Sequence, residues 1–267
     1  MFINQAVEKV LNEIAEVAGC LWQKGWAERN AGNISINITG LLSEGEKKEL
    51  NHGIRFPAAD SFNMINGQVY LMTGTGTRMR EIAKCPSENI CIVTVNEKSQ
   101  VSYFPLRVIK ERILQPTSEI YTHLAIHQML LQTGGVNKVV LHAHVTGFIA
   151  LTQIKKFQSS RTISELIWKM HPEAVMFCPK GLGYVPYMLP GSPQIAKKTV
   201  NSLLKYDVIV WGQHGGLVVA PTLNEAFDTI DLAAKSIEIF FTCRNAGFEP
   251  DGLSQKEWTQ IRRSVCG

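Results

Sequence analysis

The stretch that decides the fold is "VNKVVLHAHVTGFIAL", residues 136–151. Its first half is an apolar run with β-branched residues, which predicts a buried strand over 138–145. His142 and His144 occupy positions where such a strand normally carries valine or leucine. Residues i and i+2 of a strand face the same side, so the two imidazoles project together. They are either core histidines satisfied by hydrogen bonds or a pair that binds one metal ion.

Helical and strand patterns alternate around this stretch. A helix is expected after Pro116, with Thr117 or Ser118 as its cap and Gly134 at its end. Further helices are expected over 146–154, 159–170, 192–206 and 222–247, the last two beginning at the caps Ser192 and Thr222. "AVMFC" (174–178) and "VIVWG" (208–212) are typical of buried strands.

The N-terminal half shows a similar mixture. An apolar face from Val7 to Trp22 predicts a helix that ends at Gly25, and strands are expected over 34–38 and 68–77. Residues 89–104 predict a hairpin, whereas residues 40–66 are polar and irregular, which indicates a surface insertion. With no repeat and no linker, we expect residues 1–267 to form a single α/β domain. Its central sheet should be mixed, mostly antiparallel and flanked by helices.

Composition excludes several classes of function. The chain has 267 residues, 45% of them hydrophobic and 19% charged, with a net charge of +4. Such values are typical of a soluble globular protein, and no basic run predicts binding to nucleic acid or to a membrane. The first 17 residues contain three glutamates and do not predict a secretory signal. The six cysteines show no CxxC spacing, which favours reduced thiols in a cytoplasm.

A third metal ligand is needed for a typical catalytic zinc site. His214 follows the predicted strand 208–212 and is flanked by glycines that permit close backbone approach. A strand-end histidine beside a turn is the plainer interpretation. A competing ligand set is Glu119, His123 and His127, which recur at four-residue spacing on one helical face. That set lacks the HExxH pattern of a metalloprotease, which argues against a protease.

Two turns and one helix start have the chemistry of phosphate sites. "TGTGT" (73–77) offers glycine N–H groups and hydroxyls, and "NAGN" (30–33) offers amide groups around a glycine. Thr117 and Ser118 add hydroxyls at a helix N-terminus, where anions are favoured. Each motif is also a common turn or cap, but together they suggest a phosphorylated small molecule bound beside a metal.

The ordered set "ERNAGNISI", "TGTG", "PTSE", "HAH" and "HG" resembles the class II, zinc-dependent sugar-phosphate aldolase and epimerase family. The resemblance covers nearly the whole chain. The insertion at 40–66 and the segments 21–33 and 183–196 are similar to the longer aldolases of the family. One departure is Thr75, where those aldolases are expected to carry serine, which keeps the hydroxyl group. The resemblance implies aldol cleavage of a sugar phosphate and one zinc ion for each subunit of a cytoplasmic homotetramer, with active sites at subunit boundaries.

The resemblance also implies roles for individual residues. The zinc ligands fall on His142, His144 and His214, and the catalytic acid/base falls on Glu119. A second catalytic glutamate, reaching the site from a neighbouring subunit, falls on Glu173, although the preceding "KMHP" departs from the pattern. The phosphate contacts fall on Asn30, Gly32, Asn33, Thr75, Gly76, Thr117 and Ser118. His123 and His127 are then structural or support the ligands.

Three alternatives remain at this point. The chain could catalyse another reaction of the same family, the cleavage of a different sugar phosphate or a pentulose-phosphate epimerisation. It could be a non-catalytic scaffold similar to the adducin head, although that scaffold lacks a working zinc site and all three histidines and the glutamate stand here. It could also be an unrelated zinc hydrolase.

Overall fold

A single nine-stranded sheet forms the centre of the molecule in the computed structural model, which describes residues 4–50, 53–57, 62–107 and 113–266. Its strand order is β2-β5-β4-β3-β1-β6-β9-β8-β7. All neighbouring strands pair antiparallel except β7 and β8, which are parallel. The predicted fold class, an α/β fold with a mixed and mostly antiparallel sheet, is therefore confirmed. The strands are β1 (Asn33–Asn37), β2 (Ile54–Arg55), β3 (Val69–Thr73), β4 (Ile90–Val95), β5 (Val101–Pro105), β6 (Val139–Ala143), β7 (Leu182–Val185), β8 (Val208–Trp211) and β9 (Gly215–Ala220).

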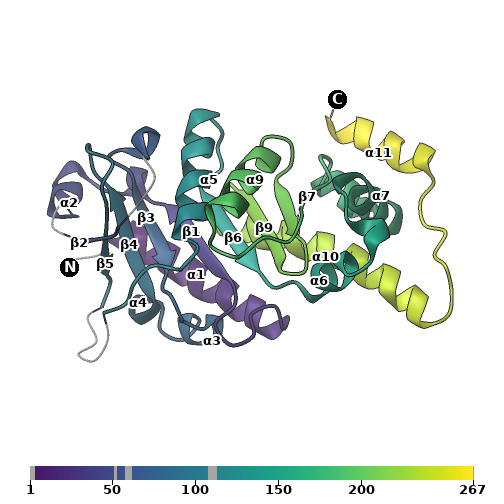
Figure 1. Ribbon diagram of the computed structural model, residues 1–267, viewed down its shortest axis with the longest axis horizontal. Coiled ribbons are helices and arrows are strands. Elements are labelled where there is room, and N and C mark those ends of the chain that lie inside the picture. Colours follow the sequence, from purple (N-terminus) through teal and green to yellow (C-terminus); the bar gives the residue numbers. More distant parts are fainter. Residues whose placement is uncertain (1–3, 51–52, 58–61, 108–112, 267) are drawn as a thin grey trace.

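Helices cover both faces of this sheet (Figure 1). The α-helices are α1 (Gln5–Gln23), α2 (Glu44–Glu49), α3 (Met79–Ile82), α4 (Pro86–Asn89), α5 (Ile120–Gln132), α6 (Thr146–Thr152), α7 (Ser160–Met170), α8 (Pro172–Phe177), α9 (Pro193–Leu203), α10 (Leu223–Asn245) and α11 (Gln255–Cys266). Helices α5 and α9 lie on one face, and α1, α3, α6 and α10 lie on the other (Figure 1). None of the helices in the described ranges is both long and apolar enough to span a membrane.

Successive side chains of β1 point to opposite faces of the sheet, and both faces are buried. Ile34 and Ile36 point into the larger core under α1 and α10. Asn33 and Ser35 alternate with them and are also buried, so they face the opposite side, toward α5. Neighbouring strands place Tyr70 among the apolar residues of that second side. A strand that is buried on both faces thus carries polar residues on the face covered by α5.

The capping signals located the longer helices well. Ser192 accepts a hydrogen bond from the Ile195 N–H at the start of α9, and Thr222 accepts one from the Glu225 N–H at the start of α10. The expected cap of α5 is wrong. The N-cap residue is Glu119, and Thr117 lies outside the helix because its N–H bonds to the Thr73 carbonyl oxygen. That bond ties the segment to the end of β3.

Two further expectations need correction. "AVMFC" is not a strand but the body of α8, because Pro172 at the first helical position presets a helical start. A five-residue apolar run does not distinguish the two structures by periodicity. The segment 40–66 is more ordered than its composition indicates, since it contains α2 and the edge strand β2, and it buries Phe62 and Ile65. Residues 51–52 and 58–61 of that segment lie outside the described residues.

Candidate active site

A pocket of about 350 Å³, here called the central pocket, opens where β1, β3, β6 and the β8–β9 turn come together. Almost every residue proposed for the site from the sequence lines this pocket: Asn30, Gly32, Asn33, Thr75, Gly76, Thr117, Ser118, Glu119, His142, His144 and His214. The exception is Glu173. Residues that sequence reasoning missed, Glu28, Arg29 and Pro190, line it as well.

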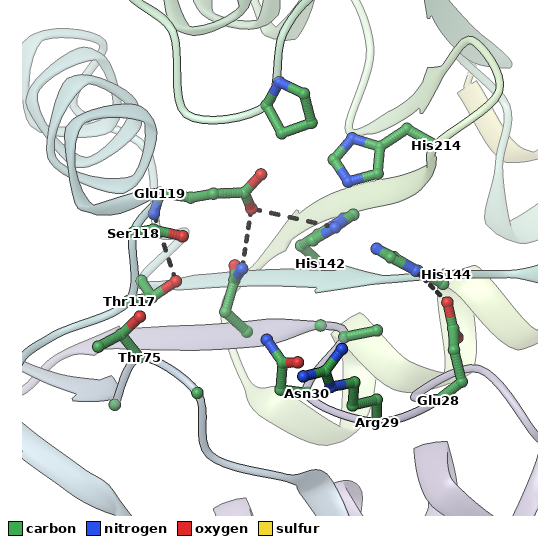
Figure 2. A pocket seen from close by; sticks show the side chains of 16 residues that line it. Glu28, Arg29, Asn30, Thr75, Thr117, Ser118, Glu119, His142, His144 and His214 are labelled. Carbon is green, nitrogen blue, oxygen red and sulfur yellow. Dashed lines mark hydrogen bonds and ion pairs between the residues drawn. The ribbon is translucent and has the colours of Figure 1, made fainter.

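Three histidines meet at one end of the central pocket (Figure 2). His142 lies in β6, His144 directly follows that strand, and His214 lies in the β8–β9 turn. One ligand nitrogen from each ring lies within 4.8 Å of the others. Among the described residues no other cluster of three or more His, Cys, Asp or Glu has this spacing. The backbone around His214 is tight, because an added Cβ at Gly215 would lie 2.4 Å from the Ala143 carbonyl oxygen.

The second nitrogens of these rings show how two of the histidines are oriented. His142 Nδ1 lies 2.8 Å from the Gly216 carbonyl oxygen, and His144 Nδ1 lies 2.6 Å from Glu28 Oε1. In both rings Nδ1 therefore donates and Nε2 is left with its lone pair. His214 Nδ1 is buried and has no hydrogen-bond partner in the described part of the chain.

Burial favours the neutral form of two of these imidazoles, His142 and His214. Desolvation, and then the neighbouring His144, lowers the pKa of His142 to about 3. Desolvation and then His142 lower the pKa of His214 to about 4. A neutral imidazole with a free lone pair is the form that binds a metal ion, so the donor set fits a divalent cation at neutral pH.

Glu119 lies beside the histidines at the N-cap position of α5. It is 5% exposed, and its Oε2 accepts a hydrogen bond of 2.8 Å from Asn33 Nδ2. The same oxygen is 3.9 Å from His142 Nε2. A carboxylate is therefore held next to the proposed metal position while its second oxygen points away from Asn33 (Figure 2).

Hydroxyl groups line the other end of the central pocket. Thr75, Thr117 and Ser118 lie beyond Glu119 from the histidines (Figure 2). Thr75 belongs to the turn after β3, and Gly76 in that turn has φ 68°, a conformation that glycine tolerates best. Hydroxyl groups and turn N–H groups at this end are suited to an anion. Arg29, which has φ 51°, is the one lysine or arginine among the described residues that line the pocket.

The competing ligand set does not meet at the central pocket. His123 and His127 are buried behind it and bond to Ser35, with Oγ–Nδ1 and Oγ–Nε2 distances of 2.6 and 2.8 Å. His123 Nε2 lies 2.5 Å from Asn33 Oδ1. Both ring nitrogens of His123 and Nε2 of His127 are thus engaged by neutral hydrogen-bonding groups.

Glu173 lies elsewhere in the chain. It is in the first turn of α8, where its Oε2 lies 3.0 Å from His171 Nε2, and it does not line the central pocket. Its side chain is half-exposed. A role for Glu173 in a neighbouring subunit's site therefore stays a prediction.

The residues of the central pocket suit a particular kind of ligand. A histidine group that could hold a metal ion, a buried carboxylate and a set of hydroxyl groups line one pocket, which could therefore accommodate a small anionic molecule beside the carboxylate and the histidines. Glu28 could have been suspected from the sequence, since it lies two residues before the "NAGN" turn. Its pairing with His144, 116 positions away, could not have been predicted from the sequence.

Comparison with known proteins gives a consistent result. Residues 12–241 match the family model described as the class II aldolase and adducin N-terminal domain. The chain is 38% identical to a rhamnulose-1-phosphate aldolase of Bacteroides thetaiotaomicron, covering 96% of this chain and 94% of the relative. It is 29% identical to the rhamnulose-1-phosphate aldolase of a Yersinia pseudotuberculosis strain, covering 89% and 86%.

Solved structures share the fold. A sugar-phosphate aldolase from Thermotoga maritima superimposes with a TM-score of 0.73 at 28% identity, covering 92% of this chain and 100% of that one. An L-fuculose 1-phosphate aldolase superimposes with a TM-score of 0.62 at 17% identity, covering 97% of each chain. The second likeness is one of fold alone.

Proposed function

The chain belongs to the class II aldolase and adducin N-terminal domain family, and from this premise we propose that it is a lyase that cleaves L-rhamnulose 1-phosphate. The products are dihydroxyacetone phosphate and L-lactaldehyde, formed by breaking the C3–C4 bond in L-rhamnose catabolism. The observation that carries the proposal is the central pocket, in which the three histidines, Glu119 and the hydroxyl groups meet. The relatives named rhamnulose-1-phosphate aldolase, one of them 38% identical, support this substrate.

His142, His144 and His214 would hold one divalent cation. Three imidazoles beside a carboxylate suit zinc, which is the ion we propose. Bound there, the ion would supply Lewis-acid stabilisation of the negative charge that cleavage leaves on the dihydroxyacetone phosphate half. His142 and His144 contribute orientation, since each ring is fixed through its Nδ1 hydrogen bond.

Glu119 acts as the acid/base. Cleavage removes a proton from the C4 hydroxyl group, breaks the C3–C4 bond and returns a proton to C3. Glu119 lines the pocket and its Oε2 is held by Asn33, so Oε1 would carry the proton to and from C3. A buried carboxylate is suited to this transfer because burial strengthens its interaction with the substrate.

The opposite end binds the phosphate. Hydrogen bonds to the phosphate would come from the hydroxyl groups of Thr75, Thr117 and Ser118. Backbone N–H groups of the turns around Asn30, Gly32 and Gly76 would add to them. Arg29 adds a positive charge at the same pocket. The phosphate does not react, so these contacts supply binding energy and orientation for the bond that breaks.

The proton of the C4 hydroxyl group needs an acceptor other than Glu119. We assign it to Glu173 of a neighbouring subunit in a cytoplasmic homotetramer, as the resemblance of the sequence implies. The exposure of Glu173 at the surface of one chain is compatible with this role. Loss of turnover in Glu173→Gln, with the tetramer retained in sedimentation, would support it.

Other functions of the fold have less support. Cleavage of L-fuculose 1-phosphate rests on a structural likeness of 17% identity, and nothing in the central pocket favours pentulose-phosphate epimerisation. A non-catalytic scaffold would not need the metal-binding histidine group and the buried Glu119 together.

The deciding experiment measures release of dihydroxyacetone phosphate. L-rhamnulose 1-phosphate and L-fuculose 1-phosphate are compared, each with and without a chelator. We expect chelator-sensitive release from the rhamnulose substrate, lost in His144→Ala together with the metal and reduced in Glu119→Ala with the metal retained. Release only from the fuculose substrate would correct the substrate, and full turnover in Glu119→Ala would refute its role.

A further inference from the structure

A buried chain of hydrogen bonds leads from Glu119 into the core between β1 and α5. Asn33 Nδ2 donates to Glu119 Oε2 at 2.8 Å, and Asn33 Oδ1 lies 2.5 Å from His123 Nε2. His123 Nδ1 lies 2.6 Å from Ser35 Oγ, which lies 2.8 Å from His127 Nε2. Ser35 and His123 are fully buried, and His127 is 2% exposed. None of these last three residues lines the central pocket.

The spacing of the participants builds this chain. Asn33 and Ser35 are alternate residues of β1 and therefore point to the same face. Glu119, His123 and His127 are four residues apart and lie along one side of α5. Strand and helix thus present matching rows of polar groups.

Glu119 fixes the direction of every bond in the chain. An ionised carboxylate only accepts hydrogen bonds, so Asn33 turns its NH₂ group toward Glu119 and its oxygen toward His123. His123 then donates from Nε2 and accepts at Nδ1 from the Ser35 hydroxyl. Ser35 in turn accepts from His127 Nε2. Each donor points toward Glu119, so His127 and the carboxylate lie at opposite ends of one chain of hydrogen bonds.

The members of this chain satisfy one another. A buried polar group left without a partner destabilises a protein, and each link of this chain supplies such a partner. Two other buried hydroxyl groups among the described residues have none. The Tyr70 hydroxyl, whose ring lies 4.4 Å from that of His127, and the Thr122 hydroxyl are buried without partners among the described residues.

We propose that Ser35, His123 and His127 are positioning residues for the acid/base Glu119 and act on it through Asn33. The inference rests on the proposed function of Glu119. It also changes the role of Asn33, because both ends of its side-chain amide are used inside the protein. Asn33 therefore holds Glu119 with its side-chain amide, rather than offering that amide to a phosphate.

The test uses His127, which lies at the far end of the chain. His127→Leu removes the donor to Ser35, whereas His127→Gln keeps an N–H group at that position. We expect His127→Leu to lower kcat about tenfold by letting Glu119 shift, with KM changed less than twofold and bound zinc unchanged. His127→Gln should restore most of kcat. Thr122→Val is the matched control. It removes a buried hydroxyl group of the same helix, and this hydroxyl has no hydrogen-bond partner among the described residues.

A double variant separates positioning from general damage. If His127 acts through Glu119, His127→Leu should reduce kcat little in a Glu119→Ala background. An equal reduction in both backgrounds, an unchanged kcat in His127→Leu, or no rescue by glutamine would overturn the inference. If His127→Leu does not fold, Ser35→Ala takes its place in both backgrounds. Failure of the proposed function is distinct, since it appears as no cleavage by the unmodified enzyme or as full activity in Glu119→Ala.

Discussion

Glu28 supports the proposed metal site through the Nδ1 side of the His144 ring. Its Oε1 lies 2.6 Å from Nδ1 of that ring, and the Trp26 carbonyl oxygen accepts a bond of 2.9 Å from the His144 backbone N–H. The turn that carries Glu28 therefore holds both the backbone and the ring of one ligand. A carboxylate in this position keeps Nε2 directed at the cation and makes it a better donor.

Glu28→Ala should weaken zinc binding by about tenfold or more, because partners that orient metal-binding histidines typically contribute a factor of 10–100 to affinity. The effect is measured by competition with a chelating dye, without reference to turnover. Glu165→Gln is a suitable control, since Glu165 pairs with Arg161 on the exposed side of α7 and with no other residue in the described ranges. Equal affinity in Glu28→Ala and the control would show that Glu28 does not support the ligand.

Gly215 constrains a second ligand through the backbone. It has φ 153°, and an added Cβ would meet the Ala143 carbonyl oxygen at 2.4 Å and the His144 Cα at 3.1 Å. Gly215→Ala should push the β8–β9 turn away from β6 and so separate His214 from His144. We expect loss of bound zinc and a decrease of about 1–3 kcal/mol in the free energy of unfolding. Retention of both in metal analysis and urea unfolding would contradict this.

At the scale of elements, the polar rows of β1 and α5 make a prediction about acid stability. Burial lowers the pKa of His127 from 6.5 to about 3 in the folded protein. Between these values the unfolded chain binds a proton that the folded chain does not. The unfolding free energy should therefore be unaffected by His127 above pH 6.5 and should fall below it, by about 1.4 kcal/mol per pH unit for this group.

His127→Gln removes the titrating group and keeps the N–H donor. Urea unfolding of chelator-treated protein between about pH 7 and 5 should show a shallower loss of stability for this variant than for the unmodified chain, by about one proton. Identical slopes would mean that His127 takes up its proton in the folded state.

Elements with strong local signals were predictable, and those without were not. Ser192, Pro193 and Thr222 mark helix starts by side-chain chemistry that acts within three residues, so α9 and α10 were located from the sequence. The run 174–178 has no such periodicity, and its helix was missed. Strands β7 and β9 and helix α11 were also not foreseen. Two glycines at the start of β9 weaken the strand pattern in its sequence. The strand forms there because β6 and β8 pair with it on either side.

At the scale of the whole molecule, the sheet brings together segments that are distant in sequence. Asn33 of β1 pairs directly with His142 of β6, and Leu217 of β9 pairs with His142 on the other side. This register aligns the "NAGN" turn, the "HAH" stretch and the "HG" turn at one end of neighbouring strands. Residue types and order indicated the site, but the Glu28–His144 pair and the Asn33 side-chain bonds depend on register, which no local pattern encodes.

Because the proposed zinc ligands come from β6 and the β8–β9 turn, the ion should also link these parts of the sheet and stabilise the whole fold. An ion that binds only the folded chain, at a free concentration about 100 times its Kd, adds about 2.7 kcal/mol to the unfolding free energy. For a protein of this size we expect Tm to rise by roughly 5–10 °C in zinc and to fall again with a chelator.

Variants distinguish this linkage from general metal effects. His144→Ala should show no zinc-dependent change in Tm, whereas Thr122→Val should respond like the unmodified chain, because its side chain lies outside the central pocket. Differential scanning fluorimetry at several zinc concentrations measures both. A zinc-dependent shift that persists in His144→Ala would mean that the ion stabilises the protein from a place other than the histidine group. An absent shift in the unmodified chain would mean that the strands are held in register without it.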